Sequence, residues 1–337
     1  MPDILNAAVI GCGGHAQHHF RMIAAEPRLH LSAVCDLDTE RLAQTREAHQ
    51  PERTFADYRE MLATCDLDVV FVLTMPGHLV PIALDCLGGE LHVCLEKPPG
   101  MSSADTRRLA AAAQEGTGKT MVSLNRRYIP AVLAVRRLVR QYGGAVHVAA
   151  TYNKPLTNIG TPALETTPAA VVCDAIHHVD LLRWLAGPAE DRAAVPVEVH
   201  AEVLDGERPG ATRHNALIRF DTGARAVFMA HYGVGYRVQR AEVHAEDFSA
   251  YMDLSDDALV ELYRAQTGAG DTAIGAPLEE GLDLEAVGGA SYDETRHFVD
   301  CIVEDRSPWS SLPDAAISME LAEAIRGGHR GAFSATV

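Results

Sequence analysis

The stretch ILNAAVIGCGGHA occupies residues 4–16 and passes from an apolar run directly into a glycine-rich turn. The apolar run has the length of a buried strand, and residues 14–25 have the composition of a helix that follows it. Gly11 permits a tight turn, Gly13 lets the backbone come close to a pyrophosphate, and the small Ala16 stands where the helix packs on the strand. The stretch therefore predicts a site where amides of a helix N-terminus bind a nucleotide phosphate.

A carboxylate follows at the distance that a dinucleotide site requires. The second apolar run, residues 31–35, ends in Asp36, where a carboxylate accepts hydrogen bonds from the adenine ribose hydroxyls. No arginine adjoins Asp36 to bind a 2′-phosphate, although Arg41 lies one turn further on. NAD is therefore the preferred cofactor, with NADP as the alternative. A plain tight turn followed by a surface aspartate is the competing interpretation.

Up to residue 123, short apolar runs alternate with longer amphipathic stretches. Further strands are predicted at 69–73, 92–95 and 121–123, and helices at 57–63, 78–87 and 102–115. This alternation indicates a doubly wound parallel sheet, in which ligands bind beyond the carboxyl ends of the strands. The residues expected at those ends are Gly11, Asp36, Thr74 and Lys97. Residues 1–123 are therefore predicted to form a dinucleotide-binding Rossmann domain.

Beyond Asn125 the pattern changes to consecutive strands. Helices are predicted at 130–142, 172–186, 292–304 and 313–326, strands at 145–152, 197–203, 215–220, 225–232, 240–245, 249–254 and 258–263, and a glycine-rich loop at 264–290. Short turns between consecutive strands imply a large, mainly antiparallel open sheet. Residues 124–337 are therefore predicted to form an α/β domain for substrate binding and oligomerisation.

Composition limits the class of protein. A hydrophobic content of 47% with 22% charged residues is that of a globular chain, and no apolar stretch has the length needed to span a bilayer. The net charge of −17 argues against a nucleic acid partner, since phosphate binding needs clustered lysine and arginine. Neither a membrane nor a nucleic acid is an expected partner.

The cysteines and histidines near the N-terminus suggest neither disulfides nor a metal. The seven cysteines are scattered and mostly set in apolar contexts, as expected of reduced core residues in a cytoplasmic protein. His15, His18 and His19 have helical spacing but no carboxylate or thiolate nearby in sequence. We interpret them as a solvated helix face and expect no metal.

A second group of chemically active residues lies between 173 and 185. On a helix, Asp174 is three residues from His177 and four from His178, so either pair can adjoin. Oxidation of an alcohol needs a base for the hydroxyl proton, and histidine titrates near neutrality. Lys97 would meanwhile bind the substrate oxygen and stabilise its developing negative charge. The competing interpretation is that His177 packs in an ordinary helix.

Taken together, these motifs resemble the glucose-fructose oxidoreductase / inositol dehydrogenase / MocA family. The matching pieces are the glycine turn, Asp36, Thr74-x-Pro76-x-x-Leu79, Glu96-Lys97-Pro98, Asn125-Arg126-Arg127-Tyr128, His177-x-x-Asp180 and Glu294-x-x-x-Phe298-Val299-Asp300-x-Ile302. The resemblance covers nearly the whole chain.

The resemblance implies NAD(P)-dependent hydride transfer to or from a sugar, cyclitol or related polyol. It makes Lys97 the catalytic lysine, places a cis bond before Pro98, and makes His177 the acid or base. Many members carry an aspartate four residues before the histidine, where this chain has Cys173. The base is therefore either His177 with Asp174 or His178. The open sheet implies a homodimer or homotetramer.

The expected site residues fall into two further groups. The cofactor contacts are Gly11, Gly13, Gly14, His15, Ala16, Asp36, Thr74, Pro76, His78, Glu96, Lys97 and Asn125. The candidate contacts to substrate hydroxyls are Arg127, Tyr152, Lys154, His231 and Tyr236. Residues 156–170 form a candidate cover for the pocket.

Two other functions use the same residues. A cofactor-assisted epimerase or eliminase would pass through a transient ketone with the same lysine and histidine. A non-catalytic protein that senses NAD or a metabolite has no chemical need for either residue, and their joint presence favours an enzyme.

Overall fold

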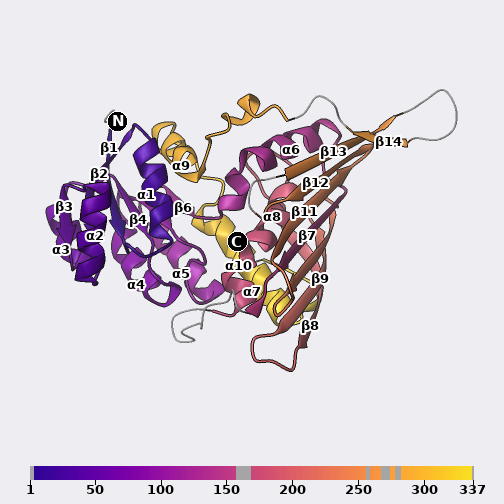
Figure 1. Ribbon diagram of the computed structural model, residues 1–337, viewed down its shortest axis with the longest axis horizontal. Helices are drawn as coiled ribbons and strands as arrows, with labels where there is room; N and C mark the ends of the chain where they lie inside the picture. The colour runs from indigo at the N-terminus through magenta and orange to yellow at the C-terminus, as the bar shows by residue number, and fades with distance from the viewer. Residues whose placement is uncertain (1–3, 157–167, 256–258, 267–273, 278–281, 336–337) are drawn as a thin grey trace. The chain divides into compact units, whose positions relative to one another are not determined.

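The computed structural model describes residues 4–156, 168–255, 259–266, 274–277 and 282–335 (Figure 1). The chain divides into two compact units, each described separately below. The first consists mainly of Met1–Ser123 and Asp293–Ala316, and the second mainly of Leu124–Pro162, Ala169–Tyr292 and Ile317–Val337. The sequence placed every residue after 123 in the second domain, whereas Asp293–Ala316 pack with the first unit.

The first unit contains a six-stranded parallel sheet of order β3-β2-β1-β4-β5-β6. Its strands are β1 (Leu5–Ile10), β2 (Leu29–Cys35), β3 (Arg53–Phe55), β4 (Val69–Val72), β5 (His92–Leu95) and β6 (Thr120–Val122). All four residues of β4 are buried, as expected of a central strand with both faces covered. The predicted doubly wound sheet is confirmed, and its order reverses between β1 and β4, where such sheets bind ligands.

Helices cover this sheet (Figure 1). They are α1 (Ala16–Ala25), α2 (Thr39–His49), α3 (Tyr58–Thr64), α4 (Pro76–Cys86), α5 (Ser103–Ala113) and α9 (Glu294–Val303). Asp38 caps α2, and Ser102 with Asp105 forms a capping box on α5. An ion pair of Asp300 with Arg28, at 2.8 Å, helps to hold α9 on this unit. Sequence patterns missed α2, because it buries only Leu42 and Thr45.

The second unit contains a nine-stranded sheet of order β14-β13-β12-β11-β7-β10-β9-β8-β15. Its strands are β7 (His147–Asn153), β8 (Pro196–Asp205), β9 (Thr212–Phe220), β10 (Arg225–His231), β11 (Val238–Ala245), β12 (Phe248–Asp253), β13 (Leu259–Gln266), β14 (Ile274–Pro277) and β15 (Arg330–Ala332). Only the β7–β10 pair is parallel among these described strands. The mainly antiparallel open sheet is confirmed.

Helices α6 (Pro130–Gln141) and α8 (Ile176–Leu185) pack on one face of this sheet (Figure 1). The short helices η1 (Asn125–Tyr128), α7 (Ala170–Cys173) and η3 (Glu285–Val287) and the later part of α10 (Leu312–Arg326) also belong to this unit. Two predictions of local structure were wrong. The predicted loop 264–290 contains β14 and η3, and the predicted helix 172–186 is broken between α7 and α8.

Candidate active site

The glycine turn joins β1 to α1 and leaves an open cradle. Gly11 has a φ of +95°, and a Cβ there would lie 3.0 Å from the Leu73 carbonyl, so only glycine fits. A Cβ at Gly13 or Gly14 would meet no atom within 4 Å. The His15 side chain makes no capping hydrogen bond to α1. The space beside Gly13 and Gly14 is therefore open at the N-terminus of α1, next to the small, buried Ala16, where the helix dipole favours an anionic group.

Asp36 follows β2 and holds its carboxylate against the same turn. It accepts hydrogen bonds from the amides of Cys12 at 2.8 Å and Asp38 at 2.9 Å, and Arg41 Nη1 lies 3.2 Å from its Oδ2. Burial opposes ionisation of Asp36, but these hydrogen bonds outweigh it and hold the pKa of the carboxyl below its usual value. Asp36 is therefore a fixed carboxylate next to the glycine turn.

Thr74, Pro76 and His78 lie at the junction of β4 and α4. Pro76 is the first residue of α4, where its missing amide hydrogen costs nothing, and His78 is exposed. Thr74 Oγ1 is buried and has no hydrogen-bond partner among the described residues. A buried hydroxyl in that state indicates that a further polar group belongs beside it.

Glu96, which directly follows β5, anchors the lysine segment. Glu96 Oε2 accepts the Lys97 amide at 2.9 Å, and its Oε1 lies 3.1 Å from Nε2 of His19 on α1. The peptide bond between Lys97 and Pro98 is cis. The prediction that His19 lies on a solvated face was wrong: its side chain is 1% exposed. It shares the buried stripe of α1 with Ala16 and other residues, and this spacing was the signal that sequence reasoning overlooked.

In the second unit, Asp174 and His177 do not lie on one continuous helix. The amide of Ala175 bonds to the carbonyl of Ala170, five residues back, which is a π-type turn. Asp174 therefore precedes α8, and its carboxylate lies 2.7 Å from Lys154 Nζ, with both side chains partly exposed. His177 lies half-buried in the first turn of α8. The structure thus pairs two of the predicted site residues, Lys154 and Asp174.

His178 lies in the interior of the second unit. Its side chain is fully buried, and neither ring nitrogen has a hydrogen-bond partner in the described parts of the chain. Burial lowers the pKa of His178 to about 3, and the charges of Arg126 and Arg237 add to this effect. The ring of the buried Tyr152 meets it edge-on, with the ring centres 5.1 Å apart. His178 is therefore neutral at physiological pH.

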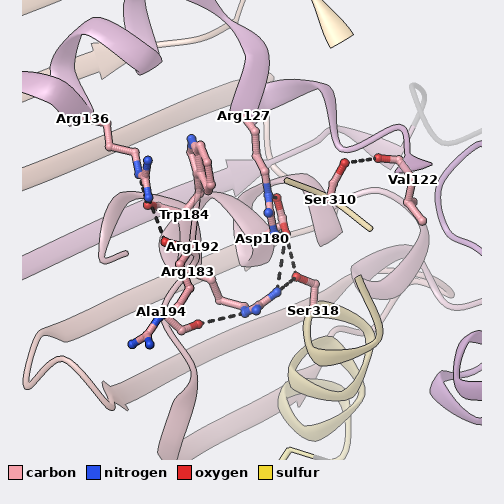
Figure 2. Close-up of polar contacts among 10 residues, drawn as sticks. All are labelled: Val122, Arg127, Arg136, Asp180, Arg183, Trp184, Arg192, Ala194, Ser310 and Ser318. Carbon is pink, nitrogen blue, oxygen red and sulfur yellow. Dashed lines mark hydrogen bonds and ion pairs between the residues drawn. The ribbon is translucent and has the colours of Figure 1, made fainter. Parts of the chain in front are cut away.

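Arg127 and Asp180 form the centre of a buried polar network (Figure 2). Arg127 Nε donates to Asp180 Oδ2 at 2.7 Å, and its guanidinium lies over the ring of Trp184. Ser318 donates to Asp180 Oδ1 at 2.6 Å and accepts from Arg183 at 2.6 Å. Arg127 is fully buried, and these contacts of its side chain lie in the interior of this unit.

The remaining predicted residues have simpler surroundings. His231 Nε2 lies 3.1 Å from Asn215 Oδ1, and Tyr236 is 73% exposed. Asn125 belongs to η1 in the second unit, and its buried Oδ1 has no hydrogen-bond partner among the described residues. Most of the predicted cover, 157–167, lies outside the described residues.

The described residues contain no group of three or more histidine, cysteine or acidic residues that could hold a metal ion. None of their helices combines the length and the apolarity required to cross a bilayer.

Comparisons with known proteins support an NAD-binding first unit. Residues 5–124 match the family model described as "Oxidoreductase family, NAD-binding Rossmann fold". D-apiose dehydrogenase of Paraburkholderia graminis is 26% identical over 94% of this chain and 85% of its own length. Inositol 2-dehydrogenase of Rubrobacter xylanophilus is 31% identical over 52% of this chain and 50% of its own length.

The solved structures extend the likeness to the whole fold. Levoglucosan dehydrogenase in complex with NADH and L-sorbose superposes with a TM-score of 0.81 at 18% identity, over 97% of each chain. The fold, the glycine turn and these relatives point to one group of proteins. Residues 5–124 match the glucose-fructose oxidoreductase / inositol dehydrogenase / MocA family of oxidoreductases, and the similarity to D-apiose dehydrogenase extends over 94% of the chain.

Proposed function

We propose that this protein is an NAD-dependent dehydrogenase that oxidises an alcohol group of a sugar, cyclitol or related polyol. The observation that carries the proposal is the anchored Glu96-Lys97 segment, which follows β5 in a sheet whose β1 opens into the glycine cradle. The relatives D-apiose dehydrogenase and inositol 2-dehydrogenase support the class of substrate.

The first unit fits a dinucleotide. The open space at Gly13 and Gly14 suits a pyrophosphate on the amides of α1, and the Asp36 carboxylate suits the ribose hydroxyls. The unpaired hydroxyl of Thr74 offers another polar contact. When bound, the cofactor would supply the hydride acceptor. Further contacts are proposed from His15, Pro76, His78, Glu96, Lys97 and Asn125.

The preference for NAD rests on Asp36. Its ionised carboxylate repels a 2′-phosphate, and its hydrogen bonds to Cys12 and Asp38 hold it in place. Arg41 is already paired with Asp36, so its charge is partly neutralised. We therefore infer that NAD binds more tightly than NADP.

His177 is proposed as the base that takes the hydroxyl proton, and Lys97 as the cation that binds the substrate oxygen. His178 is a poor base because a histidine with a pKa of about 3 is deprotonated but too weakly basic to hold the proton. The Asp174–Lys154 pair, partly exposed near the start of α8, is proposed to bind substrate hydroxyls. Tyr152, His231 and Tyr236 are weaker candidates.

The outer face of the large sheet is proposed as the contact between copies of this chain. Leu217, Val227 and Tyr251 are 60%, 36% and 39% exposed, and the strand register places them in one row across the sheet. Exposed apolar side chains in a row favour burial against a second copy. Light scattering should find a dimer or tetramer that Leu217→Glu weakens. The location proposed for the assembly is the cytoplasm.

The test is NADH formation with a panel of inositols, pentoses including D-apiose, and sugar acids. We expect Lys97-dependent turnover, with Lys97→Ala about 100-fold or more slower and its NAD dissociation constant little changed. Lys119→Ala, which removes a lysine paired with Asp305, is the matched control and should keep activity. Equal turnover of Lys97→Ala and wild type would refute the assignment. NAD binding without turnover would favour a non-catalytic sensor. Tightly retained NAD together with an epimerised product would favour an epimerase.

A further inference from the structure

Polar side chains from four parts of the first unit form two hydrogen-bonded pairs just beyond the ends of β5 and β6, His19 with Glu96 and Ser123 with Glu294. His19 comes from α1, Glu96 follows β5, Ser123 follows β6, and Glu294 is the first residue of α9. We call His19, Glu96 and Glu294 the acid–histidine cluster. The Ser123 amide donates to the carbonyl of Leu95 at 2.8 Å, which extends the β5–β6 pairing up to Glu96.

The contacts within the cluster run from the backbone of Lys97 to the helices. Glu96 bonds to the Lys97 amide with one oxygen, at 2.9 Å, and lies 3.1 Å from His19 with the other. Glu294 Oε1 accepts the hydroxyl of Ser123 at 2.7 Å. Glu96 thus links the lysine segment to α1.

Two polar atoms in the cluster are left without a partner. His19 Nδ1 and Glu294 Oε2 are buried, and neither has a hydrogen bond within the described part of the chain. The Glu294 side chain is 2% exposed. Unpaired buried polar atoms are costly and concentrate at functional sites.

The charges explain how such a cluster titrates. Burial raises the pKa of Glu294 to about 7, the charge of His19 and the Ser123 hydrogen bond oppose this rise, and the charges of Glu96 and Asp293 add to it. Burial lowers the pKa of His19, but the hydrogen bond to Glu96 and the charges of Glu294, Glu96 and Asp293 outweigh it and raise the pKa. A carboxyl that titrates near neutral pH is thus coupled through its charge to a histidine–carboxylate pair.

Other titratable groups on these elements are accounted for. Burial raises the pKa of the Cys94 thiol on β5 far above neutrality, so the thiol stays uncharged. Burial raises the pKa of Asp293, an effect that the His18 charge opposes, and burial lowers the pKa of His18. The charges of Lys97 and His15 act on Glu96 and favour its ionised form.

We propose that His19 and Glu294 are positioning residues for Lys97, which act through Glu96, and that the proton on Glu294 controls this positioning. With Glu294 protonated, Glu96 is the sole anionic partner of His19 within the cluster. When Glu294 loses its proton to bulk water, a second carboxylate competes for the same imidazolium and weakens its bond to Glu96. The proposal rests on the function proposed above, because Lys97 needs positioning only if it acts in turnover.

The kinetic test uses Glu294→Gln, which keeps an acceptor for Ser123 but cannot ionise. Asp300→Asn is the matched control, since it removes a carboxylate from the same helix that pairs with Arg28. In wild type and Asp300→Asn, kcat should fall as the pH rises above about 7, and Glu294→Gln should lack this fall, with the dissociation constant of NAD within about twofold of wild type. The rise of kcat that follows deprotonation of the proposed base, His177, should remain in all three proteins. His19→Ala should lower kcat about tenfold or more with little change in KM.

An infrared pH titration reads the proton without any turnover. The carbonyl stretch of a protonated carboxylic acid should disappear as the pH rises through about 7 in wild type and Asp300→Asn, and should be absent from Glu294→Gln. If Glu294→Gln does not fold, Ser123→Ala takes its place. The carboxylic acid signal of Ser123→Ala should disappear at a higher pH than that of wild type, because the Ser123 hydroxyl lowers the pKa of Glu294.

The outcomes separate the two proposals. An unchanged pH profile in Glu294→Gln, or no carboxylic acid signal that depends on Glu294, overturns the positioning proposal while Lys97-dependent turnover stands. Wild-type turnover in Lys97→Ala overturns the proposed function, and the infrared signal still decides whether Glu294 holds the proton.

Discussion

Arg41 Nη1 lies 3.2 Å from Asp36 Oδ2, so this arginine is bound to the acid that would exclude a 2′-phosphate. Cofactor choice therefore depends on two opposite charges: the Asp36 carboxylate repels a 2′-phosphate, and the Arg41 guanidinium attracts it. In wild type, the carboxylate is held by the Cys12 and Asp38 amides as well as by Arg41. Both the preference and its reversal should therefore depend on these two side chains.

Replacement of Asp36 by alanine should reverse the cofactor preference. Asp36→Ala removes the acceptor for the ribose hydroxyls and releases Arg41 to bind the 2′-phosphate. We expect NAD affinity to fall about tenfold and NADP affinity to rise about tenfold, as measured by titration calorimetry. The double variant Asp36→Ala/Arg41→Ala should lose the gain for NADP. Equal affinity of wild type for both cofactors would contradict this reading of Asp36.

The two adjacent histidines should respond oppositely to substitution. His177→Leu should lower kcat about 100-fold or more, because it removes the proposed base. His178→Leu should keep kcat within about threefold, since His178 is neutral and buried. Steady-state NADH formation at pH 8 compares the variants, and thermal unfolding verifies that both fold. Loss of activity in His178→Leu alone would make His178 the base.

The Asp180 network should be a major source of stability in the second unit. Asp180→Asn leaves Arg127 as a buried cation without its anionic partner, which typically costs about 3–5 kcal/mol. Asp253→Asn is the control, because Asp253 forms an exposed pair with Arg240 and should cost less than about 1 kcal/mol. Urea unfolding followed by circular dichroism measures both. Similar midpoints for the two variants would show that the network is not stabilising.

The fold was predictable because its signals are local and repeated. The glycine turn, the buried β4 and the alternation along β9 each specify an element within a few residues. The break before α8 had no such signal, since neither glycine nor proline stands there. It arises because the Ala175 amide bonds to the carbonyl five residues back, that of Ala170, instead of four residues back. Helical spacing therefore suggested that Asp174 adjoins the histidines on one helix, whereas the structure pairs it with Lys154.

Contacts between distant residues were also out of reach of sequence reasoning. Glu96 and His19 are 77 residues apart, and Ser123 and Glu294 are 171 apart. No spacing rule links such positions, because the sheet and the return of α9 to the first unit bring them together. Glu294 was therefore recognised only as part of a motif, without a partner or a role.

The raised pKa of Glu294 also has a consequence for stability, which can be measured without substrate. A carboxyl whose pKa rises from 4.5 to about 7 on folding binds its proton more tightly in the native state. Its stabilising effect is complete below pH 4.5 and is lost as the pH rises to about 7. Glu294→Gln stays neutral, so it should be more stable than wild type at pH 8, by at most about 3 kcal/mol, and nearly equal to it at pH 5. Thermal unfolding at the two pH values tests this, with Asp300→Asn as control. If the difference in stability between Glu294→Gln and wild type were the same at both pH values, Glu294 would not titrate in this range.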